Sequence, residues 1–145
     1  MRILALDYGS VRVGLAISDH EGHVAFPLEF IKMAPLPDFL KRLKEVITEK
    51  EVEKIIVGIP RNMDGSYGPS AEKARAFMEL VKNTVPLPME GWDERLTTAA
   101  ATRMLVDADV SRKNRKMKVD KVAAQILLQS YLDNKAFGRG DVQPF

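Results

Sequence analysis

The sequence contains no cysteine and has no long apolar run. Its 145 residues therefore offer no disulfide, no zinc–thiolate site and no Cys nucleophile. No stretch approaches the roughly 18 apolar residues that a membrane span needs, and the N-terminus does not resemble a signal peptide. These absences lead us to expect a cytoplasmic protein with no membrane partner.

The chain has little excess of either charge, because 22 Lys and Arg residues nearly balance 20 Asp and Glu residues and the formal net charge is only +2. The distribution is more informative: residues 111–121 carry six cations and one anion, Asp120. A dense basic segment is a candidate contact for the nucleic-acid backbone. From charge alone, a loop that carries Lys and Arg for solubility is the more common explanation, so the segment needs support from other motifs.

The first third of the chain has the pattern of an antiparallel meander. Residues 3–7 are apolar on both faces, as in a buried central strand. Residues 12–18 alternate at period two, and residues 24–31 form a third extended run, with short turns between the runs.

Further along, strands alternate with helices. The spacing predicts a helix over 37–50, a strand over 54–58, a helix capped by Ser70, an edge strand over 86–92, a short helix over 97–106 and a last helix over 119–134. This order predicts an α/β fold with a five-stranded mixed sheet, three antiparallel strands followed by parallel additions, and helices on both faces. We expect one domain over residues 1–134 and a flexible C-terminal tail over 135–145.

Asp7 is the first candidate for chemistry, because a carboxylate ends an otherwise apolar strand. A buried charge is costly unless it is paired or binds a metal, and Gly9 allows a tight turn and a close approach by a ligand. An Asp that caps a turn is the simpler alternative. A similar hairpin binds phosphate in actin-like ATPases, but those enzymes need two related domains and this chain has room for one.

Two further groups of acids stand at the ends of elements. Asp93 and Glu94 follow the predicted edge strand, and Asp120 lies in the first turn of the predicted last helix. Acids at helix starts also suit the helix dipole, so a purely structural role stays open. Carboxylates are the ligands of hard cations such as Mg²⁺ and Mn²⁺, and two such ions can act on one phosphodiester. The sequence permits these acids to converge without showing that they do.

Four blocks in the right order resemble the YqgF (RuvX) family. They are Leu6-Asp7-Tyr8-Gly9 with Arg12-Val13-Gly14-Leu15-Ala16, Val57 to Ser66, Asp93-Glu94-Arg95-Leu96-Thr97-Thr98, and Val119-Asp120-Lys121-Val122-Ala123-Ala124 with its flanking residues. The resemblance spans about residues 1–134 and implies an RNase H-like fold similar to RuvC-type resolvases. It also implies a nuclease that acts on Holliday junctions or on the 5′ end of precursor 16S ribosomal RNA.

The resemblance also implies a site. Asp7, Glu94 and Asp120 would be the catalytic acids and the ligands of Mg²⁺ or Mn²⁺, with Asp93 as an alternative to Glu94. The expected nucleic-acid contacts are Arg12, Arg95, Arg112, Lys113, Arg115, Lys116 and Lys118. For Arg12 and Arg95, a structural role is an equally good explanation, since most arginines serve the surface.

These observations favour a metal-dependent endonuclease for structured nucleic acid. The alternative is a non-catalytic nucleic-acid-binding or ribosome-assembly module on the same fold. Ribosomal precursor particles are a possible partner for either. Symmetrical junction cleavage would need a two-fold dimer, whereas RNA trimming would not, so both a monomer and a homodimer remain open.

Overall fold

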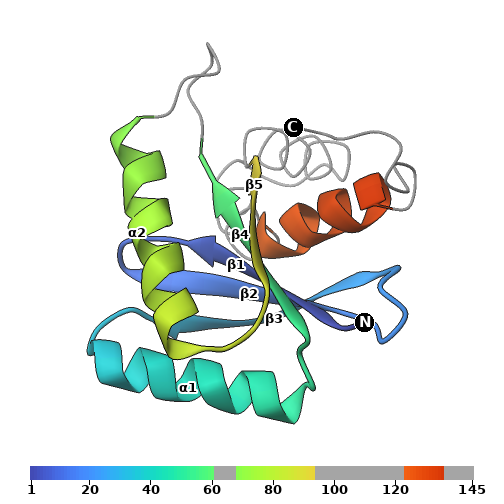
Figure 1. Cartoon of the computed structure of the whole chain (residues 1–145), viewed down its shortest axis with the longest axis horizontal. Coiled ribbons are helices and arrows are strands. Elements are labelled where there is room, and N and C mark those ends of the chain that lie inside the picture. Colours follow the sequence, from blue (N-terminus) through green and yellow to red (C-terminus); the bar gives the residue numbers. More distant parts are fainter. Residues whose placement is uncertain (61–67, 94–122, 136–145) are drawn as a thin grey trace, which may run out of the picture.

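The structure is a computed structural model that describes residues 1–60, 68–93 and 123–135 (Figure 1). The first three strands are β1 (Ile3–Tyr8), β2 (Arg12–Ser18) and β3 (Ala25–Lys32). They are followed by α1 (Leu36–Glu49), β4 (Lys54–Ile59), α2 (Pro69–Thr84) and β5 (Met89–Asp93). Residues 123–135 are helical and are called helix 123–135 below.

The five strands form one mixed sheet in the order β3-β2-β1-β4-β5, with β1 in the centre. β1 pairs antiparallel with β2, and β2 pairs antiparallel with β3. β4 pairs parallel with β1, and β5 pairs parallel with β4. The predicted five-stranded mixed sheet and its central strand are confirmed.

Apolar side chains alternate between the two faces of the sheet, and each face has its own core. Leu4 and Leu6 of β1 belong to the core that also contains Phe39 of α1 and Phe77 of α2. Ala5 belongs to a second core with Leu127 and Tyr131 of helix 123–135. Helices therefore cover both faces, as predicted, with α1 and α2 on one side and helix 123–135 on the other (Figure 1).

The two N-terminal helices begin with proline in the first turn, where a missing backbone N–H costs nothing. The prediction that Ser70 caps the second helix was wrong. Gly68 occupies the N-cap position with extended backbone, and Ser70 already lies inside the first turn of α2. Pro69 has a fixed φ that suits the first helical residue, so the helix starts two residues earlier than a Ser70 cap would place it.

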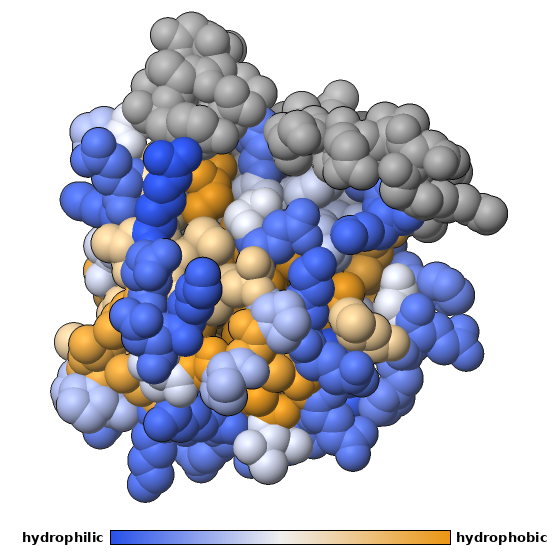
Figure 2. All heavy atoms as spheres, in the orientation of Figure 1, coloured by the Kyte–Doolittle hydropathy of each residue, from blue (hydrophilic) through white to orange (hydrophobic). Residues whose placement is uncertain are grey.

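The amphipathic helices and strands give the surface separate hydrophilic and hydrophobic areas. Figure 2 shows hydrophilic atoms over most of the viewed face, with hydrophobic atoms gathered in the area where α1, α2 and β5 lie in Figure 1. Among the described residues, no helix has both the length and the apolar character needed to cross a membrane.

Candidate active site

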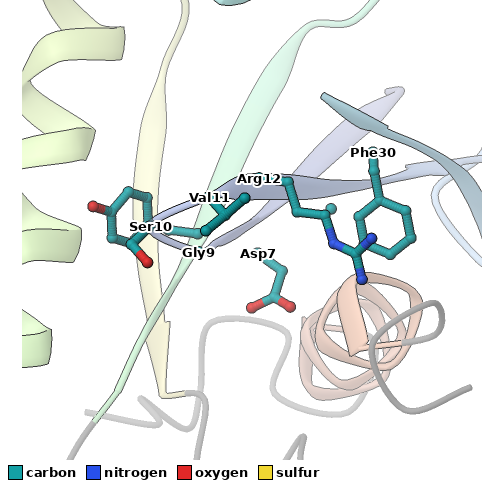
Figure 3. Close-up of a pocket in the computed structure, with 8 residues that line it drawn as sticks. Asp7, Gly9, Ser10, Val11, Arg12 and Phe30 are labelled. Carbon is teal, nitrogen blue, oxygen red and sulfur yellow. The ribbon is translucent and has the colours of Figure 1, made fainter. Parts of the chain in front are cut away.

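Asp7 lies near the C-terminal end of the central strand. Residues of β1 alternate between faces: Ala5 packs in the core under helix 123–135 and Leu6 in the core under α1 and α2. Asp7 therefore points to the face that carries helix 123–135. Its side chain is half-buried, and Figure 3 shows the carboxylate directed into the open space on that side.

The turn after Asp7 is too tight for a side chain at Gly9. A Cβ atom at this position would lie 2.6 Å from the backbone oxygen of Arg12. A Cβ atom essentially never lies so close to a carbonyl oxygen, so glycine is required for β1 to reverse into β2 at this point. The predicted role of Gly9 in a tight turn is thus supported by the geometry.

The reversal leaves a hollow of about 320 Å³ beside Asp7. It opens on the surface, and the chain around it comes from the β1–β2 hairpin and from β3. Its lining residues are Asp7, Tyr8, Gly9, Ser10, Val11, Arg12, Gly14 and Phe30. Figure 3 shows Asp7 and Arg12 on the same side of the hairpin, with the ring of Phe30 beside Arg12. We call this space the Asp7 hollow.

Three residues form one row across the sheet at the base of the hollow. Asp7 pairs with Gly14 on β2, and Gly14 pairs with Phe30 on β3. A Cβ at Gly14 would lie 3.2 Å from Cε1 of Phe30 and 3.8 Å from Cβ of Ala124. The missing side chain of Gly14 therefore leaves room between the carboxylate and the ring, and it lets helix 123–135 approach the sheet closely.

Sequence reasoning did not single out Gly14 or Phe30 as site residues. Gly14 interrupts an apolar strand, which often marks a place where a ligand or another backbone comes close. That signal was available. Phe30 had none, because an aromatic residue in a strand is ordinary.

Arg12 is exposed and lies over the face of Phe30, with its guanidinium carbon 4.2 Å from the ring centroid. At this distance a guanidinium and an aromatic ring attract each other. The predicted nucleic-acid contact Arg12 thus lies in the same hollow as the predicted catalytic acid Asp7.

Asp93, the alternative ligand to Glu94, lies on the other face of the sheet. It pairs with Ile59, which belongs to the core under α1 and α2, whereas its neighbour Trp92 packs in the core under helix 123–135. Asp93 is buried, with 6% of its surface exposed. Strand β4 separates β5 from β1, and Asp7 and Asp93 stand at the same end of the sheet but point to opposite sides.

The other predicted site residues lie outside the described residues. They are Glu94, Asp120, Arg95, Arg112, Lys113, Arg115, Lys116 and Lys118. The expected short helix over 97–106 and residues 136–145 of the expected tail also lie outside the described residues, whereas residue 135 belongs to the helix and not to a tail.

Helix 123–135 is held over the site by contacts that join three elements. Lys54 Nζ donates hydrogen bonds to Glu90 Oε2 (2.9 Å) and to the Tyr131 hydroxyl (2.6 Å), and that hydroxyl donates to Glu90 Oε2 (2.9 Å). Trp92 meets the Tyr131 ring edge-on at 5.2 Å between centroids and donates from Nε1 to the Ser130 hydroxyl. These contacts tie the helix to β4 and β5.

The same network shifts two ionisation equilibria. Burial acts to lower the pKa of Lys54, but the hydrogen bonds with Tyr131 and Glu90 outweigh it, so the pKa is raised. Burial acts to raise the pKa of Glu90, but its bonds with Lys54 and Tyr131 outweigh it, so the pKa is lowered. Both shifts favour the charged forms, which keeps the ion pair intact at neutral pH.

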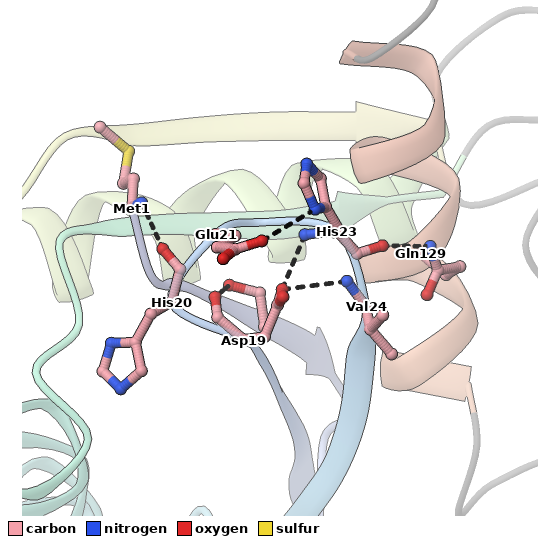
Figure 4. A network of polar contacts seen from close by, with 8 residues as sticks. Met1, Asp19, His20, Glu21, His23, Val24 and Gln129 are labelled. Atoms are coloured by element: carbon pink, nitrogen blue, oxygen red, sulfur yellow. Dashed lines mark hydrogen bonds and ion pairs between the residues drawn. The ribbon is translucent and has the colours of Figure 1, made fainter.

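At its opposite edge the helix is joined to β3. Gln129 Oε1 accepts a hydrogen bond from the Ala25 backbone N–H (2.9 Å), and Gln125 Nε2 donates to the Ala25 carbonyl (3.1 Å). Gln129 Nε2 also donates to the His23 carbonyl (3.0 Å) (Figure 4). The two glutamines are one helical turn apart, so both reach the same residue of the edge strand.

A second group of metal-binding side chains lies in the β2–β3 turn. Single ligand atoms of Asp19, Glu21 and His23 fall within 4.8 Å of one another and could hold a metal ion (Figure 4). Asp19 Oδ1 accepts hydrogen bonds from the backbone N–H groups of Val24 (3.0 Å) and His23 (2.7 Å), which lower the pKa of Asp19. The turn follows Ser18, four residues or roughly 13 Å along β2 from Gly14, so the group does not belong to the Asp7 hollow.

Solved structures of other proteins share this fold. RuvC from Thermus thermophilus superposes with a TM-score of 0.57 at 14% identity, over 95% of this chain and 97% of RuvC. The Holliday junction resolvase of fowlpox virus superposes with a TM-score of 0.54 at 16% identity, over 92% of this chain and 99% of the viral chain. The fold is therefore that of the RuvC-like, RNase H-like resolvases, as predicted.

The chain belongs to the RuvX family of Holliday junction resolvases, whose family model matches residues 1–134. A relative from Halothermothrix orenii is 51% identical over 140 residues, covers 95% of this chain and 100% of its own length, and is named "Putative pre-16S rRNA nuclease". The resemblance seen in the sequence is confirmed. So is the class of activity: the protein is a nuclease, a hydrolase of phosphodiester bonds, and its partner is nucleic acid.

Proposed function

We propose that this protein is a metal-dependent endonuclease that cleaves structured nucleic acid at the Asp7 hollow. The observation that carries the proposal is the position of Asp7. Its half-buried carboxylate stands at the end of the central strand, in an open hollow that also contains the cationic side chain of Arg12. A carboxylate that faces an anionic substrate needs positive charge beside it, and a metal ion would supply more than Arg12 alone.

The donor chemistry at the hollow fits a hard divalent cation. Asp7 offers carboxylate oxygens, which Mg²⁺ and Mn²⁺ prefer, and an open space for water and substrate. Asp7, Glu94 and Asp120 would hold the ions. When bound, the ions would polarise the phosphoryl oxygens and make a bound water more acidic.

The faces of β5 favour Glu94 over Asp93 as the second ligand. Trp92 and Asp7 share the face of helix 123–135, whereas Asp93 points to the α1 and α2 face. Asp93 therefore points away from the Asp7 hollow and is a poor candidate for a ligand there. This argument supports our proposal that Glu94, and not Asp93, is the ligand.

Asp120 gains support from the packing of the last helix. Ala124 lies against Gly14, the cross-strand partner of Asp7. Asp120 precedes Ala124 by four residues, which is about one turn of a helix. The sequence predicts a helix from residue 119, and a spacing of four residues is that of neighbours on one helical face, so we propose Asp120 as a ligand at the Asp7 hollow.

The cationic residues would bind the substrate backbone. Arg12 would contact the phosphate beside the scissile bond, because it shares the hollow with Asp7. We propose that Arg95, Arg112, Lys113, Arg115, Lys116 and Lys118 contact phosphates further along the strand. Such contacts set position and affinity without reading sequence.

The name of the Halothermothrix orenii relative makes the precursor of 16S rRNA the first substrate to test. The family description makes the four-way DNA junction the second. We propose the ribosomal precursor as the substrate, in the cytoplasm, and with precursor particles as partners. A non-catalytic binding module is the competing function, and it predicts binding of the same RNA without cleavage.

The test is side-by-side cleavage of a synthetic precursor RNA that spans the 16S 5′ end and of a synthetic four-way DNA junction. Each is incubated with the full chain in Mg²⁺, in Mn²⁺ and in a chelator. The proposal predicts metal-dependent cleavage of the RNA. Binding without cleavage in either metal would favour the competing module, and cleavage of the junction alone would overturn the ribosomal substrate. Sedimentation of the protein with the junction would show whether a dimer forms.

A further inference from the structure

The ring of Phe30 lines the Asp7 hollow, and packing in an apolar core does not explain its position there. Phe30 is half-buried on the edge strand β3, and it belongs to neither apolar core of the described residues. Its ring lines the hollow and lies 4.2 Å from the guanidinium carbon of Arg12.

We infer that Phe30 is a positioning residue that holds Arg12 toward the substrate phosphate beside Asp7. The inference rests on the proposed function for the identity of the ligand, a nucleic-acid phosphate. Three relationships between described residues carry it, and each concerns a different neighbour of the ring.

The first relationship is the row Asp7–Gly14–Phe30. These residues are paired across three neighbouring strands, so the carboxylate and the ring rise from the same line on the same face. Strands lie about 4.8 Å apart, which puts the backbones of Asp7 and Phe30 roughly 10 Å from each other. Both residues line the Asp7 hollow.

The second relationship is the gap at Gly14. Any side chain there would meet Phe30 Cε1 at 3.2 Å and would fill the space between the ring and Asp7. The glycine therefore keeps the floor of the hollow open beside the ring.

The third relationship concerns the flexibility of arginine. A long exposed side chain at the start of β2 has many rotamers, and ordering it costs free energy on binding. A planar guanidinium that already rests on an aromatic face loses less freedom when it meets a phosphate. The charge of Arg12 would then be directed at one place in the hollow before the substrate arrives.

The test is a double-mutant cycle on affinity. A fluorescent precursor RNA of the 16S 5′ end is titrated with full-length protein in chelator, so that cleavage does not enter the measurement. Phe30→Leu should weaken affinity roughly three- to tenfold, and Arg12→Gln by at least as much. In the Arg12→Gln background, Phe30→Leu should change affinity by less than about twofold, because Phe30 acts through Arg12.

Two aromatic variants and two controls make the result specific. Phe30→Tyr and Phe30→Trp should keep near wild-type affinity, since the ring face is retained. Phe26→Leu removes another exposed aromatic residue of β3 that pairs with Ile17 on the opposite face, and it should have no effect. Thermal melts of all variants identify any that fail to fold, and the aromatic variants keep the test decisive if Phe30→Leu is one of them.

Additive losses in the cycle would overturn the inference, because the ring would then act independently, for example by stacking on a base. An equal loss in Phe30→Tyr would overturn it as well. Neither result touches the proposed function, which depends on cleavage in the presence of metal. Conversely, a protein that shows the predicted cycle but never cleaves would refute the nuclease chemistry and leave the role of Phe30 intact.

Discussion

Asp7 and Gly14 are cross-strand partners on β1 and β2, and the bare backbone of Gly14 leaves the Asp7 carboxylate beside an open hollow. The same glycine lets Ala124 of helix 123–135 come within 3.8 Å of the position that its Cβ would take. One residue without a side chain thus serves two purposes, room for substrate and close packing of a helix.

Gly14→Ala should therefore lower the rate of cleavage while it changes the free energy of unfolding only slightly. The added methyl group would meet Phe30 Cε1 at 3.2 Å, and the ring can shift to relieve the contact. The free energy of unfolding should change by no more than about 1 kcal/mol, while kcat/KM falls as the hollow narrows. Chemical unfolding and steady-state cleavage of the same preparations measure both.

Gly91→Ala is the contrasting variant. Its Cβ would lie 2.9 Å from Ile59 Cγ1 in the other core, so overpacking should cost about 1–3 kcal/mol of stability. Cleavage per folded molecule should be preserved, because Gly91 faces away from the hollow. Equal effects of the two substitutions on activity would contradict the assignment of the Gly14 face to the site.

Glu94→Gln and Asp93→Asn should separate in activity. The alternation of β5 assigns Asp93 to the face opposite Asp7, so Asp93→Asn should retain cleavage per folded molecule even if its buried position makes it less stable. Glu94→Gln should lower kcat by at least about 100-fold through loss of a metal ligand. Initial rates of the two variants are compared at saturating Mn²⁺, with folding checked by circular dichroism. A larger loss of rate in Asp93→Asn than in Glu94→Gln would reassign the ligand to Asp93.

Tyr131→Phe should loosen helix 123–135. The variant keeps the edge-on contact with Trp92 but loses the hydroxyl that bonds both Lys54 and Glu90. Loss of these partly buried hydrogen bonds should cost about 1–3 kcal/mol of unfolding free energy. Urea denaturation measures it, and Tyr131→Leu, which also removes the ring contact, should cost more. A Tyr131→Phe variant as stable as the wild type would show that the hydrogen bonds of the Tyr131 hydroxyl contribute nothing to stability.

The basic segment can be tested by charge reversal. Arg115→Glu combined with Lys116→Glu should weaken binding of RNA and of DNA alike, because phosphates carry no sequence identity. If both residues contact phosphates, the slope of log K against log salt should flatten by about 2 units. Lys41→Glu with Lys44→Glu on α1, which packs on the face of the sheet away from Asp7, is the matched control and should leave the slope unchanged. Unchanged affinity of the Arg115→Glu, Lys116→Glu variant would mean that these cations serve solubility and do not contact nucleic acid.

Much of the fold was predictable because local patterns determine it. The apolar run ending at Asp7 predicted a central strand, and the periodicity of residues 37–50 predicted the helix observed as α1. The spacing of apolar residues over 119–134 predicted the last helix, and its described part, residues 123–135, is helical.

The rest depends on relationships between distant residues. Phe30 joins the row of Asp7 only because the β2–β3 register shifts at an irregularity between Leu15 and Ala16. A shift of the strand register by one residue moves every following side chain to the other face. The predicted meander did not include this shift, so it could not place Phe30 on the face of Asp7. The contact of Lys54 with Tyr131 joins residues 77 positions apart and was equally beyond a sequence pattern.

The central claim is that the Asp7 carboxylate takes part in the chemistry, and Asp7→Asn tests it most directly. The substitution removes the charge and one strong ligand oxygen while keeping the size of the side chain. Cleavage of the precursor RNA is measured in Mn²⁺ beside the wild type, with affinity for the same RNA measured in chelator. The account predicts a loss of at least about 100-fold in kcat with folding and affinity largely intact. Wild-type turnover by Asp7→Asn would contradict it.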